Sequence, residues 1–215
     1  MKWGLFGGTF DPIHFGHLRV AQELAGCLDL DRVIFIPAAF PPHKSSRTLA
    51  SFEHRLQMLQ LAIAGNDLFS FSDVEARRKG KSYSIDTVRH FSDSCDPNVK
   101  LYFMMGQDAF DAITTWHQWE QLLALCRFIV MTRPGYANQG LENILPARLA
   151  RSFTYDEVLD GYSGQSGCGI FFRRVTFLDI SSSIIRDQIK SGQSVRYLLP
   201  DNVIRHISEH RLYAE

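Results

Sequence analysis

Short, continuous apolar runs alternate along this chain with segments in which apolar residues recur every three or four positions. The continuous runs cover residues 3–6, 33–36, 99–105 and 128–131. Such runs are typical of strands buried on both faces of a parallel sheet. Helical spacing follows most of them, at residues 18–28, 51–64, 122–125 and 184–189. Shorter strands are expected at residues 69–71 and 170–177, so the pattern predicts an α/β fold.

The length of 215 residues suits one well-buried domain. We therefore expect a single doubly wound, Rossmann-like domain over residues 1–215, with a mainly parallel sheet and helices on both faces. Residues 134–169 fit this rhythm least. They hold a short helix around residues 144–149 and a glycine-rich segment at 161–169, expected to be a variable or mobile excursion. The terminal helix around residues 203–207 is expected to serve packing only.

Composition excludes several classes of protein. Lysine plus arginine and aspartate plus glutamate both number 23, so no basic field attracts nucleic acid or an anionic membrane. The four scattered cysteines form no Cys-x-x-Cys pair, which argues against a zinc-thiolate site and a disulfide framework. No apolar run approaches the ~20 residues that cross a bilayer, and we expect no signal peptide before the first strand. We expect a cytoplasmic protein with reduced thiols, and the sequence leaves a homo-oligomer open.

The segment Gly7–His17 carries the clearest chemistry. Gly7 and Gly8 are expected to lie in a loop between the first strand and a helix that begins near His14. Glycine lets the backbone approach a bulky anion, and the first turn of a helix offers unpaired N–H groups at a positive dipole end. His14 and His17, three residues apart, can donate to the same anion. Gly16 is expected to leave room for that ligand, so the segment predicts a phosphate site.

A metal site is the alternative for this histidine pair. The zinc-protease motif His-Glu-x-x-His needs a spacing of four and a glutamate, and the pair His14 and His17 has neither. We therefore expect no metal held by protein ligands.

Three further segments are expected to meet this motif, because each follows a strand or opens a helix. They are Pro41–Lys44, Gly106–Asp108 and Ser181–Arg186. The carboxyl ends of parallel strands share one edge of the sheet, where ligands bind. Lys44 and Arg186 can neutralise phosphate oxygens there. The basic run Arg77–Lys81 is instead expected to be a solvated loop.

These segments also resemble a known family. Gly7–His17 is similar to the His-x-Gly-His signature of a nucleotidyltransferase superfamily, and its Gly-Gly-Thr-Phe-Asp-Pro start resembles the bacterial nicotinate-nucleotide adenylyltransferases. Pro41–Lys44, Ser82–Thr87 and Ile180–Arg186 resemble further segments of that family. Ser84 and Ser183 stand where threonine is common, and each keeps the hydroxyl. The resemblance covers nearly the whole chain except residues 134–169.

The resemblance implies transfer of AMP from ATP to nicotinate mononucleotide, giving nicotinate adenine dinucleotide and pyrophosphate. Mg²⁺ would be bound mainly through the substrate phosphates. The implied catalytic residues are His14, His17, Lys44 and Arg186. The implied ATP-binding residues are Gly7, Gly8, Thr9, Phe10, His14, His17, Gly106, Asp108, Ser182, Ser183 and Arg186. The implied mononucleotide-binding residues are Lys44, Ser82, Tyr83, Thr87 and Trp116.

Within that implied site, Trp116 would stack on the pyridine ring, and Thr87 with the backbone near Trp116 would receive the nicotinate carboxylate. Asp108 would lie near the ATP ribose. Asp11 is interpreted mainly as turn chemistry. Three alternatives stay open: nicotinamide mononucleotide or phosphopantetheine as acceptor, a cytidylyl transfer on the same fold, and a non-catalytic nucleotide sensor.

Overall fold

The strands form one twisted sheet whose centre lies between β1 and β4. The computed structural model describes residues 1–41, 49–132, 140–164 and 167–214. The strand order is β3-β2-β1-β4-β5-β8-β7-β6. The first six strands are parallel, and β7 and β6 are antiparallel. The chain runs outward from β1 in both directions, so the point between β1 and β4 is the topological switch point at which such sheets bind ligands.

The strands are β1 (Lys2–Gly8), β2 (Arg32–Pro37), β3 (Phe69–Phe71), β4 (Lys100–Gly106), β5 (Arg127–Thr132), β6 (Thr154–Asp156), β7 (Gly161–Ser163) and β8 (Gly169–Arg174). The main helices are α1 (Phe15–Cys27), α2 (Phe52–Ile63), α4 (Ser84–Ser94), α6 (Trp119–Leu125), α8 (Ser182–Lys190) and α9 (Asp201–Glu209). Short α-helical turns are α3 (Val74–Arg77), α5 (Gln107–Asp111) and α7 (Ala147–Ala150). Two 3-10 turns cover Ile113–Thr115 and Leu141–Asn143.

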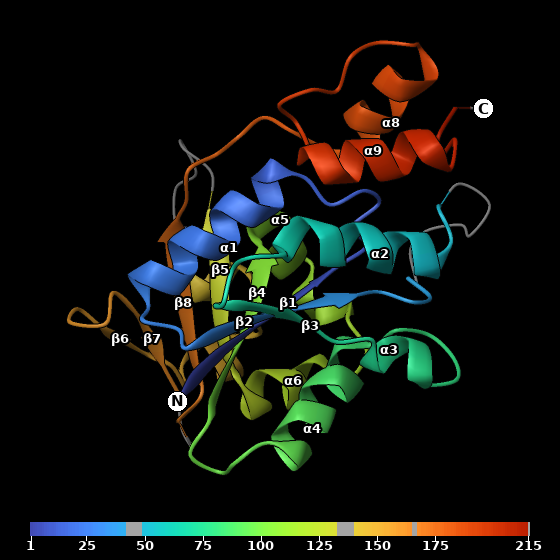
Figure 1. Cartoon of the computed structure of the whole chain (residues 1–215). Coiled ribbons are helices and arrows are strands. Elements are labelled where there is room, and N and C mark those ends of the chain that lie inside the picture. The colour runs from blue at the N-terminus through green and yellow to red at the C-terminus, as the bar shows by residue number, and fades with distance from the viewer. Residues whose placement is uncertain (42–48, 133–139, 165–166, 215) are drawn as a thin grey trace.

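Helices cover both faces of the sheet, as predicted (Figure 1). One face packs against α1, α2, α8 and α9, and the other against α4, α5 and α6. The strands are apolar on both sides, with Val33 to Ile36 all buried, because each face needs its own core. Serine side chains begin two of the helices: the Ser51 hydroxyl accepts from the His54 amide at 3.3 Å and that of Ser181 from the Ile184 amide at 3.2 Å.

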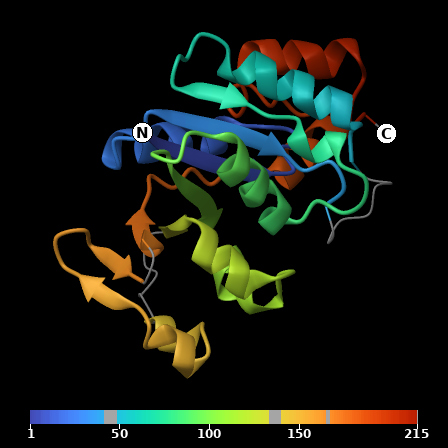
Figure 2. The ribbon, with the colours of Figure 1, turned by 90° about the horizontal axis from the view of Figure 1, so that it is seen from below.

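The segment from β5 to β8 forms the far edge of the sheet. Its β6–β7 hairpin pairs with β8 and extends away from the helices (Figure 2). The predicted excursion is therefore an antiparallel addition to the sheet in its described part, and the predicted helix around 144–149 is the short turn α7. The predicted last strand ends at Arg174, three residues early. None of the helices within the described residues combines the length and the apolarity that crossing a bilayer would need.

Candidate active site

The loop after β1 differs from the predicted one in where its glycines lie. Gly7 and Gly8 are the last two residues of β1, and neither has a positive φ. Phe10 takes the left-handed conformation instead, with φ of 47°, and its ring is buried. A Cβ on Gly8 would lie 2.8 Å from that ring. Gly8 is thus needed for the close packing of Phe10 and not for a flexible loop.

His14 and His17 lie together at the start of α1. Their rings stack with centroids 3.7 Å apart and an interplanar angle of 29°, and the His14 amide donates to Nδ1 of His17 at 3.3 Å. His14 is the N-cap residue and is 6% exposed. Burial lowers the pKa of His14 to about 4, so its imidazole is neutral at pH 7. The predicted shared orientation of the two rings is present.

Gly16 serves the protein itself. A Cβ on Gly16 would lie 2.9 Å from Nδ1 of His14, so the space that was expected to hold a ligand holds the His14 ring. The helix amides are also partly used: Phe15 donates to the carbonyl of Leu198 at 3.0 Å. The segment before α9 therefore caps α1, and fewer of its N–H groups face a ligand than we expected.

Arg55 joins the site although no sequence motif marks it. Its guanidinium is buried and donates to the carbonyls of Thr9 and Ala38 at 2.8 Å each and of Ala50 at 3.2 Å. These carbonyls belong to the loop after β1, the end of β2 and the approach to α2. Arg55 thus joins three segments at the ligand-binding edge. The available signal was an arginine within the helical stripe of apolar residues from Phe52 to Ile63.

Asp11 is also more than a turn residue. Its side chain is 1% exposed, and its Oδ1 accepts from the Tyr213 hydroxyl at 2.6 Å and from the Ala50 amide at 3.1 Å. Nη1 of Arg186 lies 3.7 Å from Oδ2 and donates to the Asp11 carbonyl at 2.7 Å. The carboxylate therefore connects the loop to α8 and to the chain's C-terminal segment.

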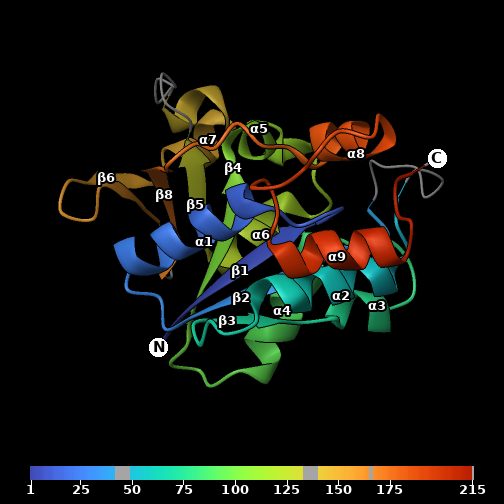
Figure 3. The same ribbon diagram turned by 45° about the horizontal axis from the view of Figure 1, so that its top comes forward.

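The start of α8 contacts the same loop. The Ser182 hydroxyl donates to the Pro12 carbonyl at 2.9 Å, and Nη2 of Arg186 donates to the Ser183 hydroxyl at 3.4 Å. The predicted serines and arginine are thus brought beside the loop, as Figure 3 shows for α8 near the start of α1. Their polar groups hold the loop in its position.

A pocket of about 190 Å³ opens between the histidines and the end of β4. Its lining includes His14, His17, Gly106 and Asp108, which are four of the predicted ATP-binding residues. Thr9, Phe10, Ser182, Ser183 and Arg186 do not line it. Lys44 lies outside the described residues. The pocket sits at the β1–β4 switch point, where an α/β sheet binds nucleotides.

A second pocket, of about 470 Å³, lies beside the first turn of α4. It is lined by Ser82, Tyr83, Trp116 and His117, together with Lys81 from the basic run that was expected to be only solvated. The His117 ring lies 4.3 Å from the Tyr83 ring at 31°. Trp116 is half-buried, edge-on to Phe103 of β4. The aromatic character suits a flat ring as ligand.

Two predicted mononucleotide contacts have partners inside the protein. The Ser82 hydroxyl accepts from the amides of Ala39 and Phe40, each at 3.1 Å. The Thr87 hydroxyl is buried, donates to Glu75 at 2.8 Å and accepts from Arg78 at 2.8 Å. Thr87 does not line the aromatic pocket. A carboxylate in that pocket would meet Lys81 at its rim before it could reach Thr87.

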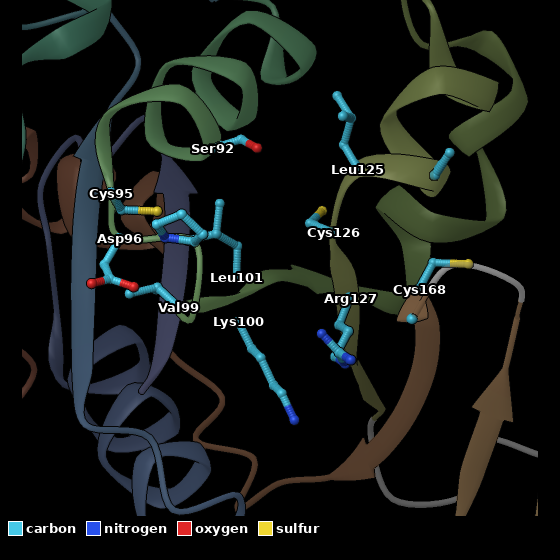
Figure 4. A pocket seen from close by; sticks show the side chains of 13 residues that line it. Ser92, Cys95, Asp96, Val99, Lys100, Leu101, Leu125, Cys126, Arg127 and Cys168 are labelled. Atoms are coloured by element: carbon cyan, nitrogen blue, oxygen red, sulfur yellow. The ribbon is translucent and has the colours of Figure 1, made fainter.

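A third hollow, of about 390 Å³, lies at the opposite edge of the sheet, below the first residues of β4 and β5 (Figure 4). Cys95, Cys126 and Cys168 line it together with Lys100 and Arg127. All four cysteines are free, in agreement with the expected reduced thiols. None of the predicted site residues that the structure describes lines it.

Comparison with known proteins agrees with the geometry. A family model described as cytidylyltransferase-like matches residues 5–188. A probable nicotinate-nucleotide adenylyltransferase of Geotalea uraniireducens is 45% identical over 213 residues, covering 99% of this chain and 98% of its own length. That of Geobacter sp. strain M21 is 44% identical over 215 residues, covering 100% and 99%.

Solved structures agree on the fold. The Plasmodium falciparum nicotinic acid mononucleotide adenylyltransferase, solved in complex with NaAD, aligns with a TM-score of 0.75 at 19% identity, covering 99% of this chain and 97% of its own. The resemblance of the motifs to this family is confirmed by full-length relatives. The chain belongs to the nicotinate-nucleotide adenylyltransferases of the cytidylyltransferase-like family.

Proposed function

We propose that this protein transfers AMP from ATP to nicotinate mononucleotide and releases pyrophosphate. The observation that carries the proposal is the pocket at the β1–β4 switch point, where His14 and His17 face Gly106 and Asp108. It places imidazoles at the start of a helix, where an anion is favoured. The full-length relatives are named for the same reaction.

The reaction needs alignment more than it needs a nucleophilic side chain. The 5′-phosphate of the mononucleotide is already an anion at neutral pH, so its oxygen can attack the α-phosphorus of ATP without a general base. As that bond forms, the bond from the α-phosphorus to the bridging oxygen of pyrophosphate breaks. His14 and His17 would stabilise the charge that develops on the transferring and leaving phosphates. Lys44 and Arg186 are proposed to assist them.

Arg186 would gain a further partner in this mechanism. Its guanidinium donates to the Asp11 carbonyl and to the hydroxyl of Ser183, which lies one turn earlier in α8. The forked donors of an arginine can hold a loop carbonyl and a phosphate oxygen together. We therefore propose that Arg186 couples the loop conformation to the presence of ATP phosphates.

Magnesium fits this site through the nucleotide. Mg²⁺ prefers oxygen ligands and keeps several waters. Asp108 is exposed at the pocket, and we propose that it contacts a hydrated ion while phosphate oxygens supply the remaining ligands. The ion would neutralise charge on the phosphates. The histidines and arginine act on the same oxygens from the protein side.

The acceptor is proposed to bind in the aromatic pocket. Trp116 and Tyr83 offer faces for a pyridine ring, and Lys81 offers a cation for the carboxylate that distinguishes nicotinate from nicotinamide. The proposed carboxylate contact therefore moves from Thr87 to the rim of the pocket. A neutral amide would gain less from Lys81, so we propose a preference for the acid form.

Pyrophosphate release tests the proposal. Purified protein with ATP and Mg²⁺ is offered nicotinate mononucleotide, nicotinamide mononucleotide or phosphopantetheine in parallel. We expect release with nicotinate mononucleotide far above the other two. Nucleotide binding without release for any acceptor would instead indicate a nucleotide sensor.

His17→Ala tests the phosphate site separately. Loss of one preorganised donor to a transition-state oxyanion lowers turnover about 10²–10³-fold. We expect that loss in a variant that still folds, with a decrease of about 0.5–2 kcal/mol in the free energy of unfolding because the His14 amide loses its acceptor. Near-normal turnover of the folded variant would remove His17 from the mechanism. His90→Ala, on the exposed side of α4, is the matched control and should keep full turnover.

A further inference from the structure

Three histidines that the proposed reaction does not use meet between α2 and α9. His54 lies in the first turn of α2, His206 lies in α9, and His210 is the residue that ends α9. Figures 1 and 3 both show these two helices side by side. One ring nitrogen from each histidine lies within 4.8 Å of those of the other two. Nδ1 of His54 and Nε2 of His206 are 3.2 Å apart.

These separations suit a shared metal ion. Zinc binds imidazole nitrogen at about 2.0–2.1 Å in tetrahedral geometry, which places two ligand nitrogens about 3.4 Å from each other. The His54–His206 pair already has this separation. His210 is exposed and its ring lies against those of His206 and His54, with centroids 4.2 and 4.8 Å away, so a movement of about 1 Å would complete the ligand set.

The orientation of His210 supports a ligand role. Its Nδ1 lies 2.9 Å from the carbonyl oxygen of His206, and because a carbonyl can only accept, Nδ1 carries the proton. The lone pair of a neutral His210 is therefore on Nε2. A backbone carbonyl that fixes the tautomer in this way is the usual support of a metal-bound histidine.

The spacing of two of these histidines is itself a signal in the sequence. His206 and His210 are four residues apart on one helix, with Glu209 between them, whereas the metal alternative considered from the sequence concerned only His14 and His17. Two histidines at a spacing of four lie on one helical face, as in zinc-binding helices. The terminal helix, expected to serve packing only, thus carries two of the three candidate ligands.

We propose that His54, His206 and His210 bind one divalent transition-metal ion, with zinc the best match to three imidazoles. Imidazole suits zinc, copper and nickel, whereas magnesium prefers oxygen. In the metal-free protein one of His54 and His206 donates a hydrogen bond to the other. Binding requires that the tautomers shift, so that both facing nitrogens present lone pairs to the ion, and that the His210 ring moves closer to them.

The position of the site gives it a structural effect. His54 precedes Arg55, which holds the carbonyls of the loop after β1, and His210 precedes by three residues Tyr213, which donates to Asp11. Besides the histidines, α2 and α9 share a hydrogen bond from Asn202 to the Leu61 carbonyl at 2.7 Å. A metal ion would link α2 and α9 at their other end. It would thereby stabilise the positions of Arg55 and Tyr213, which hold the loop after β1.

Cobalt titration tests the site directly. The full chain is treated with chelator, dialysed and titrated with Co²⁺ in the absence of nucleotide. We expect one equivalent to bind with the visible absorption of tetrahedral cobalt and without the near-ultraviolet charge-transfer band that a thiolate ligand would give. Zn²⁺ should displace it, a roughly 1,000-fold excess of Mg²⁺ should not, and zinc should raise the Tm by several degrees.

Variants decide between this site and adventitious binding. His54→Ala and His210→Ala should each weaken Co²⁺ binding at least 100-fold and abolish the zinc-dependent rise in Tm. His90→Ala should bind as the unaltered chain does. Neither altered ligand is buried, so each variant should fold, and circular dichroism is the measurement that checks this. Co²⁺ binding that survives His210→Ala, or no Co²⁺ binding to the unaltered chain below millimolar concentration, would overturn the proposal.

Discussion

The loop after β1 and the aromatic pocket lie on the same edge of the sheet but are held in different ways. Polar side chains from three distant segments hold the loop through hydrogen bonds: the buried Arg55 from α2, and the half-buried Arg186 from α8 and Tyr213 near the C-terminus. The aromatic pocket is lined by half-buried or exposed side chains, including Tyr83, Trp116 and His117.

This difference matches what each part would have to do. Charge on transferring phosphates is stabilised best by groups that are already in place, so a loop that is fixed before binding lowers the barrier. Stacking on a flat ring tolerates small displacements, so the acceptor side needs less support. We therefore expect changes on the loop side to lower both stability and turnover, and changes on the acceptor side to lower affinity alone.

Arg55→Ala should lower the stability of the protein more than any other change considered at the loop. It removes the donors of three carbonyls in a buried position, and we expect a loss of about 3–5 kcal/mol in the free energy of unfolding. Urea unfolding measures it. Arg77→Ala is the matched control, because that side chain is 75% exposed and pairs with Asp73 one turn away. Equal midpoints for the two variants would show that Arg55 does not support the loop.

His14 should make the loop side sensitive to acid. Its pKa is about 4 in the folded protein and 6.5 as the ordinary value, so between those values the unfolded chain binds more protons. Stability should therefore fall as the pH is lowered from 6.5 to 4, by roughly 3 kcal/mol from this residue, and should be unaffected by it above pH 7.

Urea unfolding of His14→Ala between pH 4 and pH 7 isolates this contribution. Burial and the neighbouring His210 and His54 also lower the pKa of His206, which acts in the same direction. That residue remains in both proteins, so the difference between their pH profiles belongs to His14. Parallel profiles would mean that the His14 ring is solvated in solution.

The order of strands and helices could be predicted because each element carries its own pattern of apolar residues. The candidate phosphate motif could also be identified from the sequence, since Gly8, His14 and His17 lie within one short segment. The side chains that hold this segment in place could not be predicted. Arg55 and Tyr213 are separated from Asp11 by 44 and 202 residues, and only the folded chain shows that they meet it or its loop.

Local patterns also failed where an element is short. The strands β6 and β7 have three residues each, too few for a periodic signal, so the segment was expected to be an excursion and is a hairpin on the edge of the sheet. The hydroxyl of Thr87 was assigned to the substrate because of the motif around it. Its bonds to Glu75 and Arg78 depend on the turn α3, which no pattern predicted.

Trp116→Ala should weaken the binding of nicotinate mononucleotide in the aromatic pocket. Stacking of an aromatic side chain on a base is worth roughly 1–3 kcal/mol, so we expect the KM for nicotinate mononucleotide to rise about 5- to 160-fold. The KM for ATP should change little, and the free energy of unfolding should fall by less than for Arg55→Ala, since the ring is only half-buried against Phe103. Steady-state kinetics with each substrate varied in turn measures this. Equal increases in both KM values would instead assign Trp116 a structural role.

Tyr213→Phe should give the smallest effect and the most local one. It removes a single hydroxyl that donates to the Asp11 carboxylate at 2.6 Å and leaves the ring in place. A hydrogen bond to a charged group contributes about 1.5–3 kcal/mol, and we expect the lower end because the Ala50 amide still donates to the same oxygen. Turnover should fall with stability if the C-terminal segment positions the loop. A loss of stability with full turnover would show that Asp11 is held well enough by Ala50 and Arg186, and that Tyr213 only anchors the end of the chain.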